Sequence, residues 1–391
     1  MRCLWITRQD PRPANSGELI YTLGLLDSLS VQPEAEITVL AHLPAKPCSG
    51  GPAVTWKLSG SIPSGRLRSL ASALPADAFR LGNPTQRKAL AKLLRTKWDW
   101  IVIDQAACAW ALPMIPHDAQ VAYIAHNHET EVRRQVANDG SGSLPMQAIL
   151  KWDSKKYGRM ENQLCQRANL ISAITPRDAE AFRDLAPGTP ICVLPPGYGG
   201  EIPAGAPREI TAESPRQVVL AGAFEWLAKR RNLESFLKAA STPFQNADIK
   251  FQVVGKADPE WFAELSRTYP WASFEANVPS VSPYLDASRI GLIPEALGGG
   301  FKLKALDYIF RGLPLASVEA ALSGVPINPR TEAIAAPDPE SLARAVAEKI
   351  DDLGFLNHAA RCSLEACRHA FHWADRGSTL GKALINPDSL L

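Results

Sequence analysis

The sequence contains no apolar run near the ~18 residues that a membrane-spanning helix requires. Its first apolar run, Cys3–Ile6, is also too short for the core of a signal peptide. The seven cysteines are dispersed, and none forms a Cys-x-x-Cys pair or a Cys/His cluster with zinc-like spacing. These absences argue against a secreted disulfide scaffold and a zinc module, and they predict a cytoplasmic protein in a reducing compartment.

The chain also has little excess of either charge, because its formal net charge is only +2. A balanced chain creates no overall field for a polyanion, so no nucleic-acid partner is expected. No Asp-x-Asp pair is present either. Nothing in the sequence therefore indicates a metal ion that holds a diphosphate, and no metal or other cofactor is expected.

Residues 66–97 depart from this balance, with eight basic residues and one acidic residue. A helical pattern over 85–97 places three leucines on one face and basic residues around the rest, which is typical of a surface helix packed on a sheet. The alternative is an electrostatic contact with anionic lipid, worth about 1 kcal/mol per basic residue. The partner hypothesis for residues 66–97 is therefore a peripheral contact with the inner face of a membrane.

Short apolar segments alternate with helical patterns along most of the chain, which is 46% hydrophobic and 21% charged. Such segments are typical of buried strands in parallel sheets that helices cover on both faces. The predicted strands are 2–7, 37–41, 100–104, 121–125, 170–174 and 191–194, followed by 218–221, 249–254, 272–276, 290–293 and 315–317. The helical patterns are 17–29, 85–97, 146–167, 176–185, 232–240, 258–267, 302–311 and 339–353.

The two series of strands are separated by residues 195–206, which are rich in proline and glycine. A chain of 391 residues is long enough for two domains of ~150–200 residues each. We therefore predict an α/β protein with two Rossmann-like doubly wound domains, 1–200 and 201–370, facing each other across a cleft. Residues 371–391 are expected to pack back on the first domain. Ligands of open parallel sheets bind beyond the carboxyl ends of the strands, so the cleft is the expected site.

The most informative segment is residues 290–317, where a strand leads through Gly298–Gly300 into a helix expected from Lys302. Glycines let the backbone approach a ligand closely, and a helix N-terminus favours an anion. Lys302 and Lys304 oppose the helix dipole there, a conflict that a bound phosphate or diphosphate would remove. Asp307 follows in the same helix, where a carboxylate can accept hydrogen bonds from a ribose diol. A solvated glycine-rich turn is the simpler explanation.

A second basic segment follows the strand that ends at Gly222. Lys229, Arg230 and Arg231 come directly before a helix that the pattern starts at Asn232. On residue types alone, a solvated basic turn explains them.

Two segments of the first half carry weaker signals. Gly17 begins a helix after a proline-rich loop, which suits close approach to a phosphate. His126 lies in a polar cluster at the end of the strand 121–125, where α/β proteins build their sites. The alternatives for His126 are a helix cap or a buried histidine with its hydrogen bonds satisfied. His126 and His128 have a spacing that could suit a metal, but no third ligand is evident.

In their order and spacing, these segments resemble the GT4-type (group 1) glycosyltransferases of the GT-B fold. The family's C-terminal helix reads roughly K-x-x-E-A-x-A-x-G-x-P, and this chain has Lys304, Asp307, Gly312 and Pro314 in that register. One branch of the family has a three-glycine loop followed by Thr-Arg-x-Lys, which the chain resembles from Gly298 through Phe301 and Lys302 to Lys304. In the same branch a strand ends in His-Asn-x-Glu, as this chain does from His126 to Glu129.

The resemblance implies a role for each candidate residue. The donor diphosphate would be bound by Gly17, Lys229, Arg230, Arg231, Gly298, Gly299, Gly300, Phe301, Lys302 and Lys304. Asp307 would bind the ribose, and His126, the catalytic candidate, would lie near the transferred sugar.

Three positions depart from the family pattern. The ribose-binding Glu is Asp307 here, which is one methylene shorter. The family's earlier Glu, often assigned to the transferred sugar, falls on Gly299, and the Arg at the end of the preceding strand is Ala223. Arg230 or Arg231 is the candidate substitute for that missing guanidinium.

The resemblance implies transfer of a sugar from a UDP- or GDP-sugar to a glycan, a lipid-linked saccharide or a small molecule, in polysaccharide biosynthesis. It also implies retention of anomeric configuration. No carboxylate nucleophile is evident, so we expect front-face departure and attack without a covalent intermediate, with lysines and loop N–H groups offsetting the leaving charge. The alternatives are a catalytically inactive GT-B binding subunit and a sugar-nucleotide 2-epimerase, which would need acid and base carboxylates in the cleft.

Overall fold

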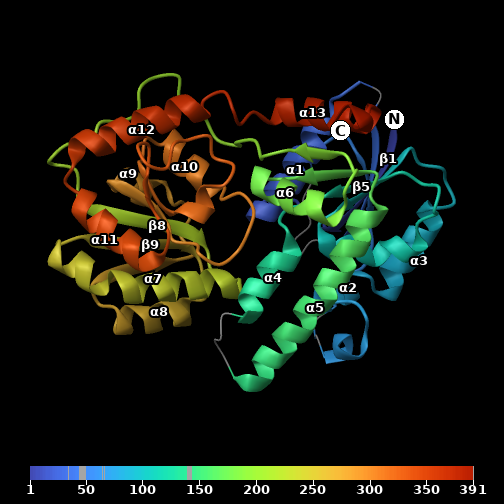
Figure 1. Ribbon diagram of the computed structural model, residues 1–391, viewed down its shortest axis with the longest axis horizontal. Coiled ribbons are helices and arrows are strands. Elements are labelled where there is room, and N and C mark those ends of the chain that lie inside the picture. The colour runs from blue at the N-terminus through green and yellow to red at the C-terminus, as the bar shows by residue number, and fades with distance from the viewer. Residues whose placement is uncertain (34, 44–49, 64, 66, 139–142, 391) are drawn as a thin grey trace. The chain divides into compact units, whose positions relative to one another are not determined.

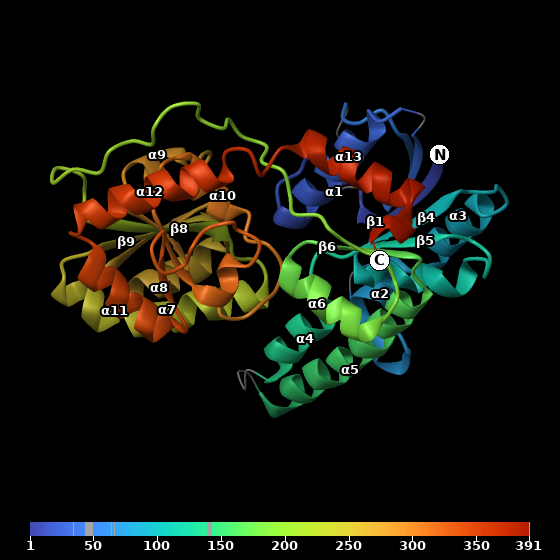
Figure 2. The same ribbon diagram turned by 45° about the horizontal axis from the view of Figure 1, so that its top comes forward.

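The computed structural model describes residues 1–33, 35–43, 50–63, 65, 67–138 and 143–390. Cys48 and Arg66, which the sequence analysis counted, lie outside these residues. The chain divides into two compact units, one formed by Met1–Gly197 with His372–Leu391 and the other by Tyr198–Phe371. Each unit is a sheet enclosed by helices (Figures 1 and 2).

The first unit is built on a seven-stranded parallel sheet in the order β3-β2-β1-β4-β5-β6-β7. The strands are β1 (Arg2–Gln9), β2 (Glu36–His42), β3 (Thr55–Leu58), β4 (Trp100–Asp104), β5 (Val121–Ile124), β6 (Leu170–Ala173) and β7 (Ile191–Val193). The helices are α1 (Gly17–Ser30), η1 (Leu67–Ala71), α2 (Ala76–Leu81), α3 (Pro84–Leu93), η2 (Ala106–Met114), α4 (Glu129–Asn138), α5 (Leu144–Arg167), α6 (Pro176–Leu185), α13 (Trp373–Ile385) and η4 (Pro387–Leu390).

The second unit has a six-stranded parallel sheet in the order β10-β9-β8-β11-β12-β13. Its strands are β8 (Gln217–Ala223), β9 (Lys250–Lys256), β10 (Ala272–Ala276), β11 (Ile290–Ile293), β12 (Leu315–Val318) and β13 (Ile334–Ala336). Its helices are α7 (Leu227–Asn246), α8 (Pro259–Thr268), α9 (Ser282–Asp286), α10 (Lys304–Phe310), η3 (Glu319–Leu322), α11 (Pro339–Lys349) and α12 (Leu353–Cys367).

The side chains of β8 show why both faces of the second sheet are covered. Val218 and Leu220 point into one hydrophobic cluster, while Val219 and Ala221 point into another. Successive residues of a strand face opposite sides of its sheet, so two apolar faces require two layers of helices. The first cluster contains residues of α7 and α11, and the second contains residues of α10 and α12.

These two sheets confirm the predicted pair of Rossmann-like doubly wound domains. The sequence did not predict the short edge strands β3 and β13, and the pattern 339–353 covers α11 but misses α12 beyond its first residue. Two helix starts were also wrong. Helix α7 begins at Leu227 rather than Asn232, so Lys229, Arg230 and Arg231 lie in its first turns. Helix α10 begins at Lys304, so Lys302 precedes it.

Within the described part of the chain, none of the helices combines the length and the apolarity needed to cross a membrane.

Candidate functional site

The strand order of the second unit indicates where a ligand would bind. The chain runs outward from β8 in one direction through β9 and β10, and in the other direction through β11, β12 and β13. The loops at the carboxyl ends of β8 and β11 therefore diverge, and ligands of doubly wound sheets bind at this switch point. The two loops lead into α7 and α10, and the loops and helices together carry most of the predicted donor-binding residues.

Lys304 and Glu295 form a close ion pair at this switch point. The Nζ atom of Lys304 lies 2.5 Å from Oε1 of Glu295, which follows β11 and is buried. The ammonium also lies next to the end of β8, because a Cβ added to Gly222 would be 3.4 Å from Nζ. Lys304 thus spans the loops after both central strands.

Two more lysines act on the same carboxylate. Burial alone would raise the pKa of Glu295, but Lys304, Lys302 and Lys229 together hold the pKa below its ordinary value. The other carboxylate oxygen, Oε2, is buried and has no hydrogen-bond partner. A buried carboxylate oxygen without a hydrogen bond is costly, and the ion pair with Lys304 and the charges of Lys302 and Lys229 offset that cost. The sequence analysis missed Glu295, although it is the single acidic residue of the segment 290–306.

The glycine loop is held by a side chain from α7. Asn232 donates from Nδ2 to the carbonyl oxygen of Leu297 at 2.8 Å and accepts from the Leu297 N–H at 2.9 Å. The loop then passes through Gly298 and Gly300, whose φ angles of 111° and 67° favour glycine. Lys302 donates from Nζ to the carbonyl oxygen of Gly299 at 2.6 Å. The conformation of the loop is therefore stabilised by the two hydrogen bonds of Asn232 and by the one from Lys302, and its positive φ angles require glycine.

The remaining predicted residues of this unit have different environments. Asp307 is exposed on α10, and burial together with the charge of Asp307 raises the pKa of Tyr198 to about 12. Phe301 packs against the ring of Phe371, with ring centroids 5.4 Å apart, so its contacts are those of a core residue.

Arg230 and Arg231 were the candidates for the guanidinium missing at Ala223. Arg230 donates from Nε to the carbonyl oxygen of Phe224 at 2.9 Å, and its guanidinium lies 4.8 Å from the ring centroid of Trp261. These contacts tie Arg230 to the loop after β8. Arg231 is half-buried in the first turns of α7.

The first unit has a corresponding switch point, because β1 and β4 are its central diverging strands. Asp104 ends β4 and is fully buried. Its Oδ1 lies 2.7 Å from Nε2 of His126, which follows β5. Its Oδ2 accepts hydrogen bonds from Trp5 Nε1 at 3.0 Å and from Thr22 Oγ1 at 2.8 Å. The sequence analysis singled out His126 but missed Asp104, whose signal was a carboxylate at the carboxyl end of an apolar strand.

The ring of His126 is also fixed by packing. Tyr21 of α1 meets it edge-on, with ring centroids 4.9 Å apart. The Tyr21 hydroxyl donates to the carbonyl oxygen of Leu194 at 2.6 Å, so the tyrosine is itself anchored. Gly17 is exposed at the start of α1, the helix that contributes Tyr21 and Thr22.

The second histidine of the polar cluster has a structural partner. His128 lies 3.9 Å from Glu161 of α5, which is fully buried. Glu161 accepts hydrogen bonds from the N–H groups of Glu129 and Thr130, so it satisfies free donors at the start of α4. In the part of the chain that the structure describes, no three His, Cys, Asp or Glu side chains come together as metal ligands do.

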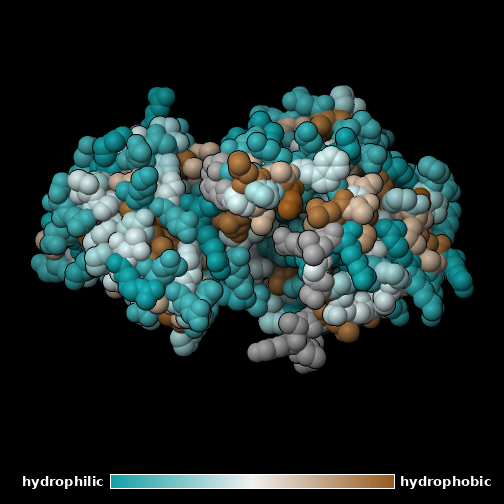
Figure 3. Space-filling model, turned by 90° about the horizontal axis from the view of Figure 1, so that it is seen from below, coloured by the Kyte–Doolittle hydropathy of each residue, from teal (hydrophilic) through white to brown (hydrophobic). Residues whose placement is uncertain are grey.

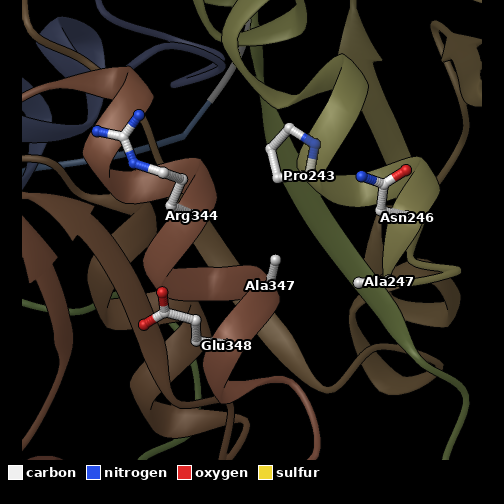
Figure 4. A pocket seen from close by; sticks show the side chains of 6 residues that line it. All are labelled: Pro243, Asn246, Ala247, Arg344, Ala347 and Glu348. Carbon is white, nitrogen blue, oxygen red and sulfur yellow. The ribbon is translucent and has the colours of Figure 1, made fainter.

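A shallow surface pocket lies elsewhere, between the end of α7 and α11. It has a volume of about 320 Å³ and is lined by Pro243, Asn246, Ala247, Arg344, Ala347 and Glu348 (Figure 4). Helix α7 starts at the carboxyl end of β8 and runs back for 20 residues, about 30 Å. The pocket is thus at the opposite end of the sheet from Lys229, and we assign it no role in the chemistry.

Residues 215–352, which lie within the second unit, match the family model described as Glycosyl transferases group 1. The second unit is a group 1 glycosyltransferase domain. The chain is accordingly a glycosyltransferase, an enzyme of class EC 2.4. A search of the curated proteins found no match.

Solved structures extend the likeness of this glycosyltransferase to both units. Sucrose-phosphate synthase from Thermosynechococcus elongatus is similar over 100% of this chain and 99% of its own, with a TM-score of 0.74 at 15% identity. Trehalose 6-phosphate synthase from Burkholderia multivorans matches with a TM-score of 0.61 at 12% identity, over 99% of both chains. The HepE protein of Anabaena, solved in complex with UDP and glucose, matches over 99% of this chain and 100% of its own, with a TM-score of 0.62 at 12% identity. At these identities the likeness shows the GT-B fold.

Proposed function

We propose that this glycosyltransferase takes its sugar from a nucleoside-diphosphate sugar bound at the switch point of the second unit. The observation that supports this most strongly is the gathering of Lys229, Lys302 and Lys304 around one buried carboxylate, Glu295. Three ammonium groups at the end of a glycine loop are suited to a diphosphate, which carries several negative charges. The lysines would turn to the diphosphate when the donor binds.

The donor in this proposal is a UDP- or GDP-sugar. Gly298, Gly299 and Gly300 would offer backbone N–H groups to the phosphates, and Asp307, exposed on α10, would accept hydrogen bonds from the ribose. Anabaena HepE, of the same fold, was solved with UDP and glucose, which favours UDP as the first nucleotide to test. Phe301 and Arg230 would act indirectly, by holding the loops through their contacts with Phe371 and Phe224.

The first unit would hold the acceptor, a glycan, a lipid-linked saccharide or a small molecule. His126 would act near the transferred sugar, with Asp104 as the residue that positions it. Preorganised lysines and loop N–H groups would stabilise the leaving nucleotide without a metal. We propose retention of configuration by departure and attack on the same face, and a trapped covalent glycosyl-enzyme would contradict this mechanism.

The experiment is a calorimetric titration with UDP, GDP, ADP, CMP and dTDP in buffer that contains a chelator. One nucleoside diphosphate is expected to bind, and Lys304→Ala should weaken it by about 10- to 100-fold, because hydrogen bonds to charged groups contribute about 1.5–3 kcal/mol. Lys256→Ala is the matched control, since Lys256 lies in the same unit and pairs with the exposed Glu225. Binding that survives Lys304→Ala unchanged would overturn the assigned donor site.

An inactive binding subunit is the second candidate, and Ala223 and Gly299 favour it because both replace functional residues of the family pattern. Such a subunit would have a decayed donor site, so failure of every nucleotide to bind in the titration would favour it. NMR of a nucleotide sugar incubated with the protein but without acceptor distinguishes the 2-epimerase from the transferase and from the inactive subunit. Only the epimerase would change the configuration at C2 of the sugar.

The predicted cytoplasmic location and the role in polysaccharide biosynthesis stay predictions. In the basic stretch 66–97, Lys88, Lys92, Arg95 and Lys97 are exposed, as a contact with anionic lipid requires. Arg87 instead donates from Nε to the carbonyl oxygen of Gly82 and lies over the ring of Trp110, so its role is structural.

A further inference from the structure

The N-terminal half of α5 exposes an unusual amount of apolar surface. Leu144 is 80% exposed, Trp152 is 51% exposed, and Met146 and Ile149 are also largely open to solvent. In Figures 1 and 2 this end of α5 extends away from the sheet of the first unit. Figure 3 shows hydrophobic side chains, in brown, grouped among hydrophilic ones on the face seen from below. Exposed apolar groups that cluster in this way mark an interaction surface.

The face of α5 that carries Leu144 and Trp152 also carries positive charge. Leu144, Ala148 and Trp152 are spaced four residues apart, so they form one stripe along the helix. Lys151, Lys155 and Arg159 are exposed on the same side. The only acidic residue of the segment 144–159, Asp153, turns inward and accepts a hydrogen bond from the Ala76 N–H at 2.8 Å. The face is therefore apolar and basic, with no exposed acid.

The adjoining η1 continues this surface. Lys156 of α5 is buried and donates from Nζ to the carbonyl oxygen of Ser69 at 2.8 Å, which fixes η1 against the helix. Leu70, 43% exposed, and the exposed Arg68 then lie beside the middle of α5. We call the exposed residues Arg68, Leu70, Leu144, Ile149, Lys151, Trp152 and Lys155 the α5 face.

We propose that the α5 face docks on the surface of an anionic lipid bilayer. Apolar side chains next to lysines on one helical face are the composition of helices that lie in a membrane interface, where the chains enter the headgroup layer and the lysines meet lipid phosphates. A second copy of this chain fits less well, because a two-fold contact would set the lysines of one face against those of the other. This inference rests on the proposed function in one respect: a bilayer would present a lipid-linked acceptor to the first unit.

This surface differs from the one that the sequence predicted within residues 66–97. Of that stretch, η1 adjoins the α5 face, whereas α3 packs on β2 and η2. The exposed lysines of α3 carry charge without neighbouring exposed large apolar residues. The two helices therefore make separate predictions that one experiment can distinguish.

The experiment measures flotation of the full chain with phosphatidylcholine vesicles and with vesicles in which about a third of the lipid is phosphatidylglycerol. Binding is expected only to the anionic vesicles and should weaken as salt is added, because salt screens exposed charges. The double variant Lys151→Gln with Lys155→Gln should weaken binding by about 30-fold, because each basic residue near the surface contributes about 1 kcal/mol, or about fivefold. Leu144→Ser with Trp152→Ser should weaken binding at every salt concentration, since that change removes apolar burial.

Two control variants match these changes. Lys88→Gln with Lys92→Gln removes the same charge from α3, and Ile385→Ser removes an exposed apolar side chain from α13. Both should float as the unmodified protein does. The proposal is overturned if the protein does not bind anionic vesicles, if only the α3 variant loses binding, or if sedimentation shows a dimer that Trp152→Ser dissociates. Nucleotide titration of the same variants tests the donor site separately, so its failure is distinguishable from failure of the α5 face.

Discussion

His126 and Asp104 form a buried pair in which Nε2 of the imidazole lies 2.7 Å from Oδ1 of the carboxylate. The second oxygen of Asp104 is occupied by Trp5 and Thr22, so the carboxylate cannot turn away from the histidine. A carboxylate acceptor fixes the proton of His126 on Nε2 and leaves Nδ1 for another partner. The pair thus sets both the orientation and the tautomer of the imidazole.

Asp104→Asn should slow sugar transfer while leaving nucleotide binding unchanged. An asparagine keeps the shape but can donate to Nε2, which would reverse the tautomer of His126. A misplaced acid or base costs about 100- to 10,000-fold in rate, so a loss in kcat of this order is expected. The measurement is turnover of the donor identified by titration, together with the affinity for its nucleotide.

Thr22→Val provides the matched control, because it removes one hydrogen bond to Asp104 Oδ2 and leaves the contact with His126. It should lower kcat by less than tenfold. Equal losses of kcat in the two variants would mean that Asp104 stabilises the fold and does not position His126.

Glu295→Gln should destabilise the protein when no nucleotide is bound. Removing one partner of a buried ion pair costs about 3–5 kcal/mol, and here three lysines would lose their shared counter-charge. A saturating nucleoside diphosphate should reduce this cost, since its phosphates would replace the carboxylate. The measurement is chemical denaturation with and without the nucleotide. Glu225→Gln, which breaks an exposed pair with Lys256, should cost no more than about 1 kcal/mol.

The pH dependence of the same variant has a defined sign. The pKa of Glu295 in the folded protein lies below its ordinary value of 4.5, because the three lysines outweigh the effect of burial. A lowered pKa stabilises the folded state above about pH 4.5, and this contribution is lost as the pH falls through the folded value. The difference in unfolding free energy between the unmodified protein and Glu295→Gln should therefore shrink below pH 4.5. A difference that grows on acidification would contradict the assignment.

How far the sequence predicts this structure depends on which interactions are local. Strands such as β10 and β11 were predicted with their observed bounds, because an apolar run followed by a turn is a local signal. The edge strand β3 has few buried residues and therefore lacks that signal. Helix α7 was predicted to start late, since its first residues, from Leu227 to Arg231, include three basic residues in a row and show no apolar period.

The candidate sites show the same limit. Glycines and lysines that adjoin in sequence were found, whereas their acidic partners were missed. Asp104 and His126 are 22 residues apart, and Glu295 precedes Lys304 by nine residues. The pairing of β4 with β5 brings Asp104 and His126 together, and strand order is a property of the whole fold. Glu295 and Lys304 meet because the loop between β11 and α10 folds back on itself, and the sequence pattern does not show that path.

Asn232→Ala should loosen the glycine loop, because the variant removes both hydrogen bonds that Asn232 makes with Leu297. Leaving buried backbone groups unpaired costs about 1–3 kcal/mol each, so reduced stability and weaker nucleotide binding are expected together. Asn232→Asp keeps the acceptor for the Leu297 N–H and loses only the donor, so its loss should be smaller. Hydrogen exchange at residues 297–300 measures the mobility of the loop directly. Exchange rates that are unchanged in Asn232→Ala would show that the two hydrogen bonds of Asn232 do not hold the loop.

Gly377→Ala should destabilise the first unit through the packing of α13 on α1. A Cβ at position 377 would lie 2.0 Å from the carbonyl oxygen of Ser28, a distance that forces the two helices apart. Overpacking of this kind costs about 1–3 kcal/mol. Gly381→Ala, one turn further along α13, is the matched control, because its Cβ would lie 3.7 Å from Leu29 in ordinary contact. Since alanine favours a helix over glycine by up to about 1 kcal/mol, that variant should be neutral or more stable. Denaturation of both variants therefore tests whether residues 372–391 dock on the first unit in solution, and equal behaviour would show that α13 does not.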